Sequence, residues 1–141
     1  MRFLSIWKSV ESNQPPSLEF MERMNALIEQ SKKSGELVAT EGCLPSALGA
    51  RIRFDNGTVV VTDGPFVETK EVIGGFAILE AASKEDAIRM VKEFLAVAGN
   101  GECELRQVFT ASQAGTAPGD SRAQLRELKN QYFETTTKST A

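Results

Sequence analysis

The acidic and basic side chains are the residues with which this chain could do chemistry, because it contains no histidine. Ser-His-Asp triads, Cys-His pairs, histidine-ligated zinc and histidine general bases are therefore excluded. Two cysteines are present, Cys43 and Cys103, and they form no CxxC motif, so they predict neither a metal site nor a redox pair. We interpret both as reduced, buried small hydrophobic residues. We expect no metal and no cofactor.

The most distinctive polar segment spans residues 63–71, with the sequence DGPFVETKE. Asp63 is a candidate catalytic base and Glu68 a candidate catalytic acid, since loops at the ends of sheets often carry chemistry. Glu41 is the alternative acid. A structural interpretation stands beside this one, in which Asp63 accepts hydrogen bonds from its own backbone two residues further on and the following Gly-Pro pair shapes the turn.

Cationic side chains could hold an anionic ligand near this segment. Arg106 is the leading candidate, because a charged residue on a covered sheet face must be paired or must line a wet pocket. Lys8 and Lys70 could hold a carboxylate or an enolate, and Glu41 belongs to the same candidate ligand site. The alternatives are solvated lysines and a structural ion pair of Arg106. The candidate partners in that pair are Glu104, Glu41 and Glu68.

Hydrophobic periodicity predicts the elements that must position these residues. Alternating or β-branched stretches predict strands over residues 2–8, 36–44, 51–54, 58–62, 74–80 and 102–109. Apolar residues at helical spacing predict one helix between the Ser17 cap and Gly35, and a second between the Ser83 cap and Gly99. The Asn56-Gly57 pair predicts a type I′ hairpin turn, because both central positions of that turn need positive φ.

The order β-α-β, hairpin, β-α-β predicts an α+β fold: a ferredoxin-like split βαβ antiparallel sheet with an inserted β-hairpin and both helices on one face. The open face needs a cover, and a homodimer joined through sheet faces supplies it. We expect Trp7 to fill the dimer core, with the wall of a ligand pocket as the alternative. In the last strand, Glu104 and Arg106 should face this cover. The residues expected to face the helices are Cys103, Leu105 and Phe109.

The size and charge of the chain limit its organisation and partners. A length of 141 residues predicts one core, over residues 1–110, followed by a small-residue linker (111–120) and a C-terminal helix with a disordered tail (121–141). A net charge of -3, from 19 acidic and 16 basic residues, argues against a nucleic-acid surface. No apolar run approaches membrane length and nothing resembles a targeting segment, so we expect a cytoplasmic protein.

Residues 63–71 and the Gly74-Gly75-Phe76 strand that follows resemble the signature of the DGPF, or YCII-related, family. The likeness extends to Glu41-Gly42 and to residues 104–108, and so covers roughly residues 1–110. This resemblance implies a dimeric α+β barrel in which the open faces of two ferredoxin-like sheets meet. Some YCII-like relatives carry a His-Asp pair proposed as catalytic; Asp63 matches that aspartate, and no histidine accompanies it here.

Two classes of function remain open. The chain could be a homodimer that binds or converts a small anionic metabolite, with Asp63 as base, Glu68 or Glu41 as acid and Arg106 holding the anion. It could instead be a non-catalytic dimeric accessory or regulatory module. DGPF proteins are often associated with alternative sigma factors, so the resemblance also implies a regulatory partner. Neither nucleic acid nor a membrane is an expected partner.

Overall fold

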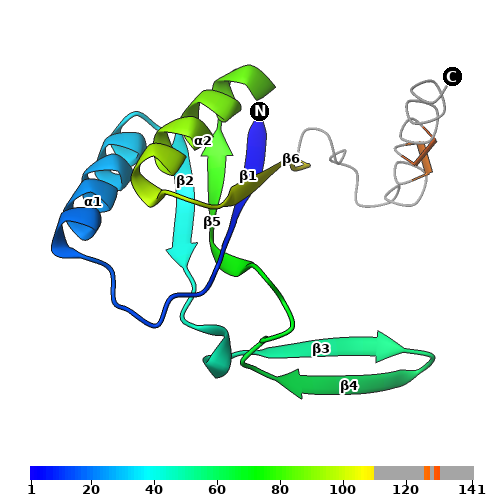
Figure 1. Cartoon of the computed structure of the whole chain (residues 1–141). Helices are drawn as coiled ribbons and strands as arrows, with labels where there is room; N and C mark the ends of the chain where they lie inside the picture. The colour runs from blue at the N-terminus through cyan, green and yellow to red at the C-terminus, as the bar shows by residue number, and fades with distance from the viewer. Residues whose placement is uncertain (110–125, 128, 131–141) are drawn as a thin grey trace, which may run out of the picture. The chain divides into compact units, whose positions relative to one another are not determined.

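A computed structural model shows a four-stranded antiparallel sheet with two helices on one face and a separate two-stranded hairpin (Figure 1). The sheet has the order β2-β5-β1-β6. Its strands are β1 (Arg2–Ser9), β2 (Leu37–Gly42), β5 (Val72–Glu80) and β6 (Glu102–Gln107), and the helices are α1 (Leu18–Lys33) and α2 (Lys84–Ala98). The predicted ferredoxin-like α+β fold is confirmed, with the last strand at an edge beside the first.

The structure describes residues 1–109 together with residues 126, 127, 129 and 130. The chain divides into two units, Met1–Val108 and Phe109–Ala141. The predicted linker and most of the predicted C-terminal helix lie outside the described residues, although residues 126, 127, 129 and 130 are helical. In the part of the chain that is described, no helix is both long and apolar enough to span a membrane.

Both helices begin where their capping residues predict. The hydroxyl oxygen of Ser17 accepts a hydrogen bond from the N–H of Phe20 at 3.2 Å, and that of Ser83 accepts one from the N–H of Asp86 at 3.1 Å. These bonds satisfy N–H groups that have no partner within the first helical turn. Gly35, at φ 80°, follows the end of α1 as predicted.

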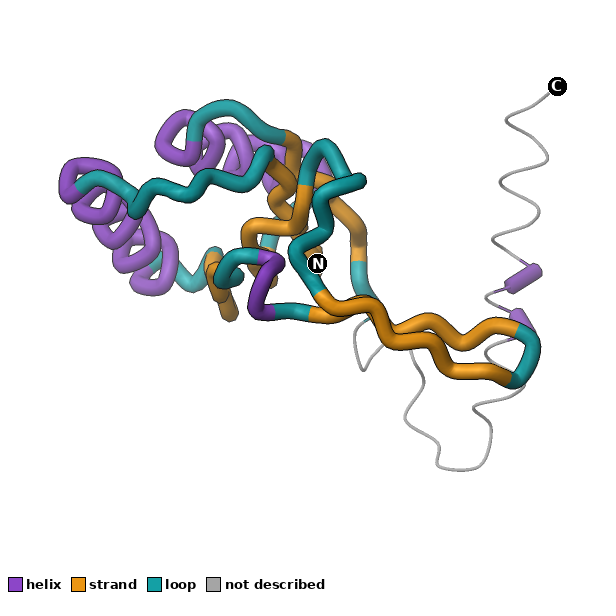
Figure 2. Tube along the Cα trace, turned by 60° about the horizontal axis from the view of Figure 1, so that its bottom comes forward, coloured by secondary structure: helices purple, strands orange, loops and turns teal. Residues whose placement is uncertain are grey.

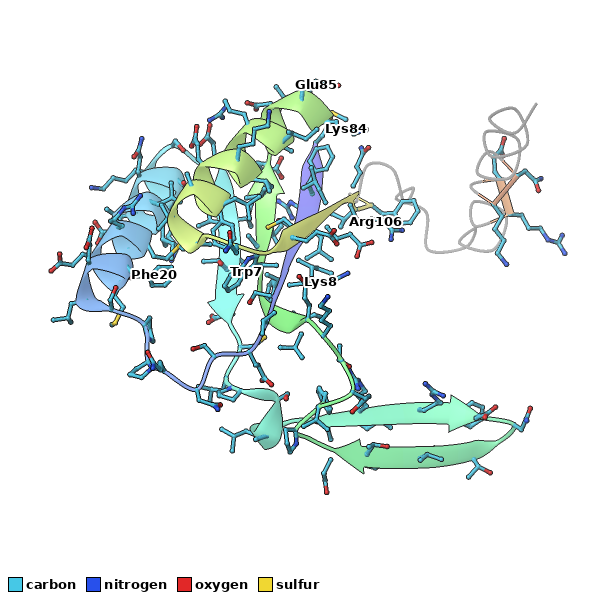
Figure 3. The ribbon with its side chains drawn as sticks, viewed as in Figure 1. Trp7, Lys8, Phe20, Lys84, Glu85 and Arg106 are labelled. Carbon is cyan, nitrogen blue, oxygen red and sulfur yellow. The ribbon has the colours of Figure 1, made fainter. Side chains whose placement is uncertain are left out.

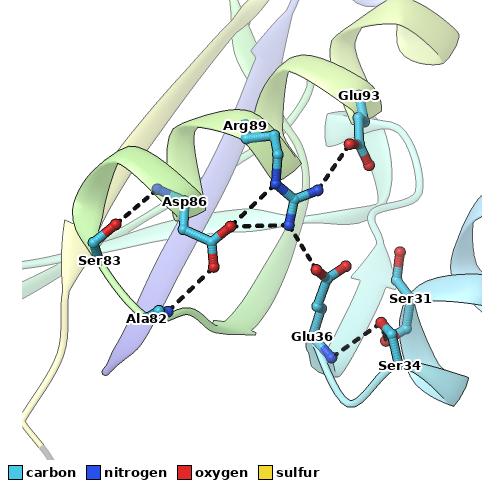
Figure 4. A network of polar contacts seen from close by, with 8 residues as sticks. All are labelled: Ser31, Ser34, Glu36, Ala82, Ser83, Asp86, Arg89 and Glu93. Atoms are coloured by element: carbon cyan, nitrogen blue, oxygen red, sulfur yellow. Dashed lines mark hydrogen bonds and ion pairs between the residues drawn. The ribbon is translucent and has the colours of Figure 1, made fainter.

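A polar network around Arg89 connects α2 to the start of β2 (Figure 4). The guanidinium donates to Asp86 and Glu93 on its own helix, at 3.0 and 2.8 Å. It also donates to Glu36, next to β2, at 2.6 Å. The third contact joins the helical layer to the β2 edge of the sheet, so the network orients α2 over the sheet.

The hydrophobic core lies between the sheet and α2, and it is small. Its buried members are Phe3, Leu79, Ala81, Ala87 and Met90, with Leu37, Ala77, Val91 and Leu105 packed against them. Helix α1 contributes no buried residue. The described part of the chain therefore buries little apolar surface on its own.

Trp7 lies on the helix face of the sheet (Figure 3). Its ring meets Phe94 of α2 edge-on, with centroids 5.8 Å apart. Gly74 and Gly101 make room for the indole, since a Cβ atom at either position would lie 2.7 or 2.6 Å from it. The expectation that Trp7 fills a core between two copies is wrong, because alternation along β1 turns it toward α2.

The prediction that both cysteines are buried is wrong for Cys43. Cys43 follows the end of β2 and is exposed, because it begins the connection that leaves the sheet. Cys103 is half-buried on the helix face, and this burial raises the pKa of its thiol.

The inserted hairpin consists of β3 (Ala50–Asp55) and β4 (Thr58–Asp63) and extends away from the sheet and helices (Figure 2). Asn56 and Gly57 have φ values of 48° and 80°, which confirms the positive φ that the predicted turn requires. All residues of both strands are exposed.

The base of the hairpin is held by Ser46, in a short 3₁₀ turn (η1, Ser46–Leu48). The Glu11 carboxylate accepts hydrogen bonds from the N–H and the hydroxyl of Ser46, and these lower the pKa of Glu11. The Ser46 hydroxyl oxygen accepts from the N–H of Phe66 at 3.1 Å. The interpretation of Asp63 as the turn-forming side chain is therefore wrong: among the described residues the loop is held from Ser46, and Asp63 is exposed at the end of β4.

Gly64→Ala should lower the free energy of unfolding by about 2 kcal/mol or more, because a Cβ at this position would overlap the carbonyl oxygen of Ser46. Chemical denaturation followed by circular dichroism measures the change. Gly42→Ala is the control, since its Cβ would meet nothing within 4 Å. We expect that variant to stay within about 0.5 kcal/mol of the parent. Equal stability of the two variants would contradict the packing of Gly64 on Ser46.

Candidate anion site on the open face of the sheet

The strand register divides the side chains of β1 and β6 between the two faces of the sheet. Leu4 pairs with Arg106, Ile6 with Glu104 and Lys8 with Glu102. Because directly paired residues point to the same side, these six side chains share the face opposite to buried Phe3 and to Trp7. This confirms the predicted orientation of Glu104 and Arg106, and that of Cys103 and Leu105 toward the helices. Phe109 departs from the prediction, because it lies beyond the end of β6 and is exposed.

Three charged side chains from neighbouring strands form a connected cluster on this open face. Two of them, Lys8 and Arg106, are labelled in Figure 3. Lys8 Nζ lies 3.0 Å from one carboxylate oxygen of Glu104, and Arg106 Nη1 lies 3.4 Å from the other. The hydrogen bond and charge of Lys8 lower the pKa of Glu104, and the same hydrogen bond raises the pKa of Lys8. Lys8 and Glu104 are therefore both ionised at neutral pH. Of the alternatives for Arg106, the structure shows the ion pair with Glu104.

The centre of the open face is apolar. On β1 and β5, Ile6 pairs with Phe76 and Leu4 with Ile78. Arg2 and Glu80 form a further ion pair of 2.8 Å beyond them. The face thus has an apolar centre between two groups of paired charges, and neither helix covers it.

The remaining predicted site residues are divided between two places. Glu41 is on the open face, where it pairs with Phe76 of β5. It belongs to β2, however, and β5 separates β2 from β1. Asp63, Glu68 and Lys70 are exposed: Asp63 ends β4, and Glu68 and Lys70 lie in the segment between β4 and β5. Within the described residues, no hydrogen bond or ion pair joins them to the charged cluster, so the structure unites Lys8 and Arg106 through Glu104 alone.

Arg51 is a partner of the motif segment that the residue pattern does not predict. Its guanidinium donates to Glu68 and, at 2.7 Å, to Thr69, and it lies over the Phe66 ring at 4.0 Å from the centroid. Arg51 is on β3, so these contacts fasten the hairpin to the segment that follows it. In the sequence, the presence of an arginine on one hairpin strand and of acidic and aromatic residues after the other strand is compatible with this contact. The contact forms only because the hairpin folds back and brings the two together.

The motif segment enters the sheet at the Lys8 end of the charged cluster. Val72 pairs with Ser9, and the negative charge of Glu71 also raises the pKa of Lys8. Arg106 is opposite Leu4, which precedes Lys8 by four residues on β1. Four residues correspond to roughly 13 Å of strand. The cluster therefore extends away from the motif end of the sheet.

An antiparallel β2-β5-β1-β6 sheet with two helices on one face and an inserted hairpin defines a ferredoxin-like α+β protein. The sequence model of the YCII-related domain matches residues 1–112, so the chain belongs to the YCII-related family. This confirms the resemblance carried by residues 63–71.

Two further comparisons show what the chain is similar to. An uncharacterised protein of Rhizobium meliloti (strain 1021) is 30% identical over 73 residues, which are 52% of this chain and 59% of that relative. A solved structure of the 5-chloro-2-hydroxyhydroquinone dehydrochlorinase of Burkholderia phenoliruptrix, in complex with 2,5-dihydroxybenzoquinone, aligns with 79% of this chain and 97% of its own. The identity is 19% and the TM-score 0.44. Family membership rests on the domain match.

The Glu104 carboxyl should titrate below the ordinary value of 4.5 in the folded protein, and Lys8→Met should raise its midpoint. Because the folded-state pKa is lowered, the ion pair contributes stability above about pH 4.5 and loses it as the pH falls through the folded value. Carboxyl ¹³C NMR titration measures the midpoint. Lys70→Met is the matched control and should leave it unchanged; an equal response to both variants would contradict the Lys8–Glu104 pair.

Proposed function

We propose that the protein is a homodimer whose open sheet faces meet and that it binds a small anionic metabolite beside Arg106. The observation that carries the proposal is the open face itself, which has an apolar centre bordered by ionised side chains. An antiparallel sheet can leave one face in water when that face is polar. An apolar face instead favours contact with another surface.

The small core supports the dimeric part of the proposal. Residues Leu4, Ile6, Phe76 and Ile78 form the apolar centre of the open face, and α1 buries no residue. A second copy supplies an identical face, and a two-fold axis matches the face to itself. The contact would remove these four side chains from water in each copy, which is the dominant favourable contribution to association.

The pairing of Arg106 supports the anionic ligand. Arg106 shares the carboxylate of Glu104 with Lys8, at 3.4 Å against 3.0 Å. Lys8 has two further carboxylates near it, Glu71 and Glu102, which raise its pKa, whereas Glu104 is the one ion-pair partner of Arg106 among the described residues. Enclosing a guanidinium that shares its partner between two sheets is unfavourable unless an anion accompanies it. The guanidinium uses one N–H donor on Glu104, and its remaining donors suit a carboxylate or phosphate.

Binding is favoured over acid–base conversion by the direction of the pKa shifts. Among the described residues, the carboxyl groups with a shifted pKa are Glu11, Glu80, Asp86 and Glu104. Each pKa is lowered by hydrogen bonds, to which nearby positive charges add in all but Glu11. A general acid needs the opposite, a carboxyl whose pKa is raised toward the working pH. Conversion with Asp63 as base and Glu68 or Glu41 as acid is the less favoured function, because Glu68 is held by Arg51 and Asp63 is exposed to solvent.

Phe76→Glu should at least halve the molar mass measured by light scattering at micromolar concentration. Phe76 is 37% exposed at the centre of the open face, so the substitution places a charge inside the proposed contact and only moderately disturbs the single chain. Leu18→Glu adds the same charge in place of an exposed apolar residue at the start of α1 and should leave the mass unchanged. An unchanged mass for Phe76→Glu, or a monomeric parent, would rule out the sheet-face dimer.

Arg106→Met should weaken anion binding by about 1.5–3 kcal/mol, the range for hydrogen bonds to charged groups. This corresponds to roughly a ten- to hundredfold higher Kd in calorimetric titrations with acetate, oxalate, malonate or inorganic phosphate. Arg2→Met is the matched control, because Arg2 is on the same face but is paired with Glu80. Undiminished affinity, or no binding of any of these anions to the parent, would refute the site. Loss of the dimer in Arg106→Met would make Arg106 an interface residue instead.

A further inference from the structure

Residues 58–62 of β4 present an edge without the features that normally protect an edge strand, and the charged Asp63 follows at the end of the strand. Residues 58–62 read Thr-Val-Val-Val-Thr, five β-branched residues without a charge or a proline. The sheet of the hairpin contains only β3 and β4, so one edge of β4 has no strand beside it in the described structure. By contrast, β3 carries Arg51, Arg53 and Asp55, which discourage pairing at its own free edge.

One face of the hairpin is also apolar. Ile52 pairs with Val61 and Phe54 with Val59, which places all four side chains on the same face. Each of them is 59–74% exposed. A two-stranded ribbon is marginally stable in water, and three or more strands with an apolar face are needed for independent stability. The hairpin therefore gains stability from additional strands.

The hydrogen bonds at the base of the hairpin show which backbone groups point outward. The N–H of Gly64 donates to the carbonyl oxygen of Gly49 on the β3 side at 2.9 Å. In an antiparallel pair the direction alternates along the strand, so Thr62, Val60 and Thr58 also bond toward β3. The N–H and C=O groups of Val59 and Val61 therefore point to the free edge.

We propose that β4 pairs antiparallel with β4 of a second copy, around a two-fold axis at Val60. This axis puts Val59 opposite Val61 of the second copy and Val61 opposite Val59 of the second copy. The sequence of residues 58–62 is the same in both directions, so like residue types meet at every position. Their outward N–H and C=O groups form two reciprocal hydrogen-bonded pairs. Only valine and threonine meet at the junction, so no like charges oppose each other. The result is a four-stranded sheet, β3-β4-β4-β3, whose apolar face is continuous across the junction.

The β4 junction is separate from the sheet-face contact proposed above. Five residues from each copy bury less than the roughly 1,200 Å² typical of stable complexes. We therefore expect a weak contact, which is best detected by a covalent trap. At the two-fold axis the two Val60 residues form a non-hydrogen-bonded pair, with Cα atoms about 4.5 Å apart. This separation is within the range that a disulfide spans.

Val60→Cys, in a Cys43→Ser background that removes the exposed native thiol, should form a covalent dimer with oxidised glutathione. Two protein thiols are oxidised to one disulfide, and one oxidised glutathione is reduced to two glutathione thiols. Arg53→Cys in the same background is the matched control, since Arg53 shares the Val60 rung but its two copies would be roughly 14 Å apart, three strand spacings. Non-reducing electrophoresis measures the covalent dimer.

Two proline variants test which edge makes the contact. Adding Val61→Pro to Val60→Cys removes an outward N–H of β4 and should abolish cross-linking. Ile52→Pro, on the same rung but at the β3 edge, should leave it intact. Circular dichroism checks that both variants fold, and cross-linking should persist with Phe76→Glu, because the junction is independent of the sheet face. Three results would each overturn the proposal. They are equal yields of covalent dimer for Val60→Cys and Arg53→Cys, cross-linking that survives in a folded Val61→Pro variant, and loss of cross-linking with Phe76→Glu.

Discussion

The four-stranded sheet has two helices to cover it, and both lie on the same face, which is the constraint on which the rest of the structure depends. Alternation along β1 sends Phe3 and Trp7 to the helices and Leu4, Ile6 and Lys8 to the opposite face. Within the described residues, the covered side forms a core of five buried apolar residues. The open side combines an apolar centre with ionised groups, and both its dimeric contact and its ligand are proposed from that combination.

The motif segment makes several architectural contacts in this chain. Gly64 packs on the Ser46 carbonyl, the N–H of Phe66 binds the Ser46 hydroxyl, and Glu68 and Thr69 hold Arg51 of β3. These contacts fix the hairpin at its base and direct the chain into β5. The segment therefore positions two surfaces at once, the hairpin on one side and the Lys8 end of the open face on the other.

Local signals in the sequence predicted most of the fold. The Ser17 and Ser83 caps, the positive φ of Asn56 and Gly57 and the face of Glu104 depend on neighbours within a few residues, and each was predicted correctly. Long-range contacts were not. The holding of the motif loop by Ser46, the Arg51–Glu68 pair and the seating of Trp7 on Phe94 join residues far apart in sequence, so periodicity carried no information about them. The prediction that Cys43 is buried was wrong because it rested on the residue type alone, whereas exposure follows from the end of β2 at Gly42, where the chain leaves the sheet.

The two proposed contacts would specify their register by different physical means. On the open sheet face, Arg2–Glu80 and Lys8–Glu104–Arg106 bracket the apolar centre, and a shifted contact would bury unmatched charges. The β4 edge has no such charges. A slip of one residue in an antiparallel pairing moves side chains to the wrong face, where Val59 and Val61 would no longer continue the row begun by Ile52 and Phe54. In the proposed β4 junction, the symmetry of residues 58–62 would therefore provide the selectivity that ion pairs would provide in the proposed sheet-face contact.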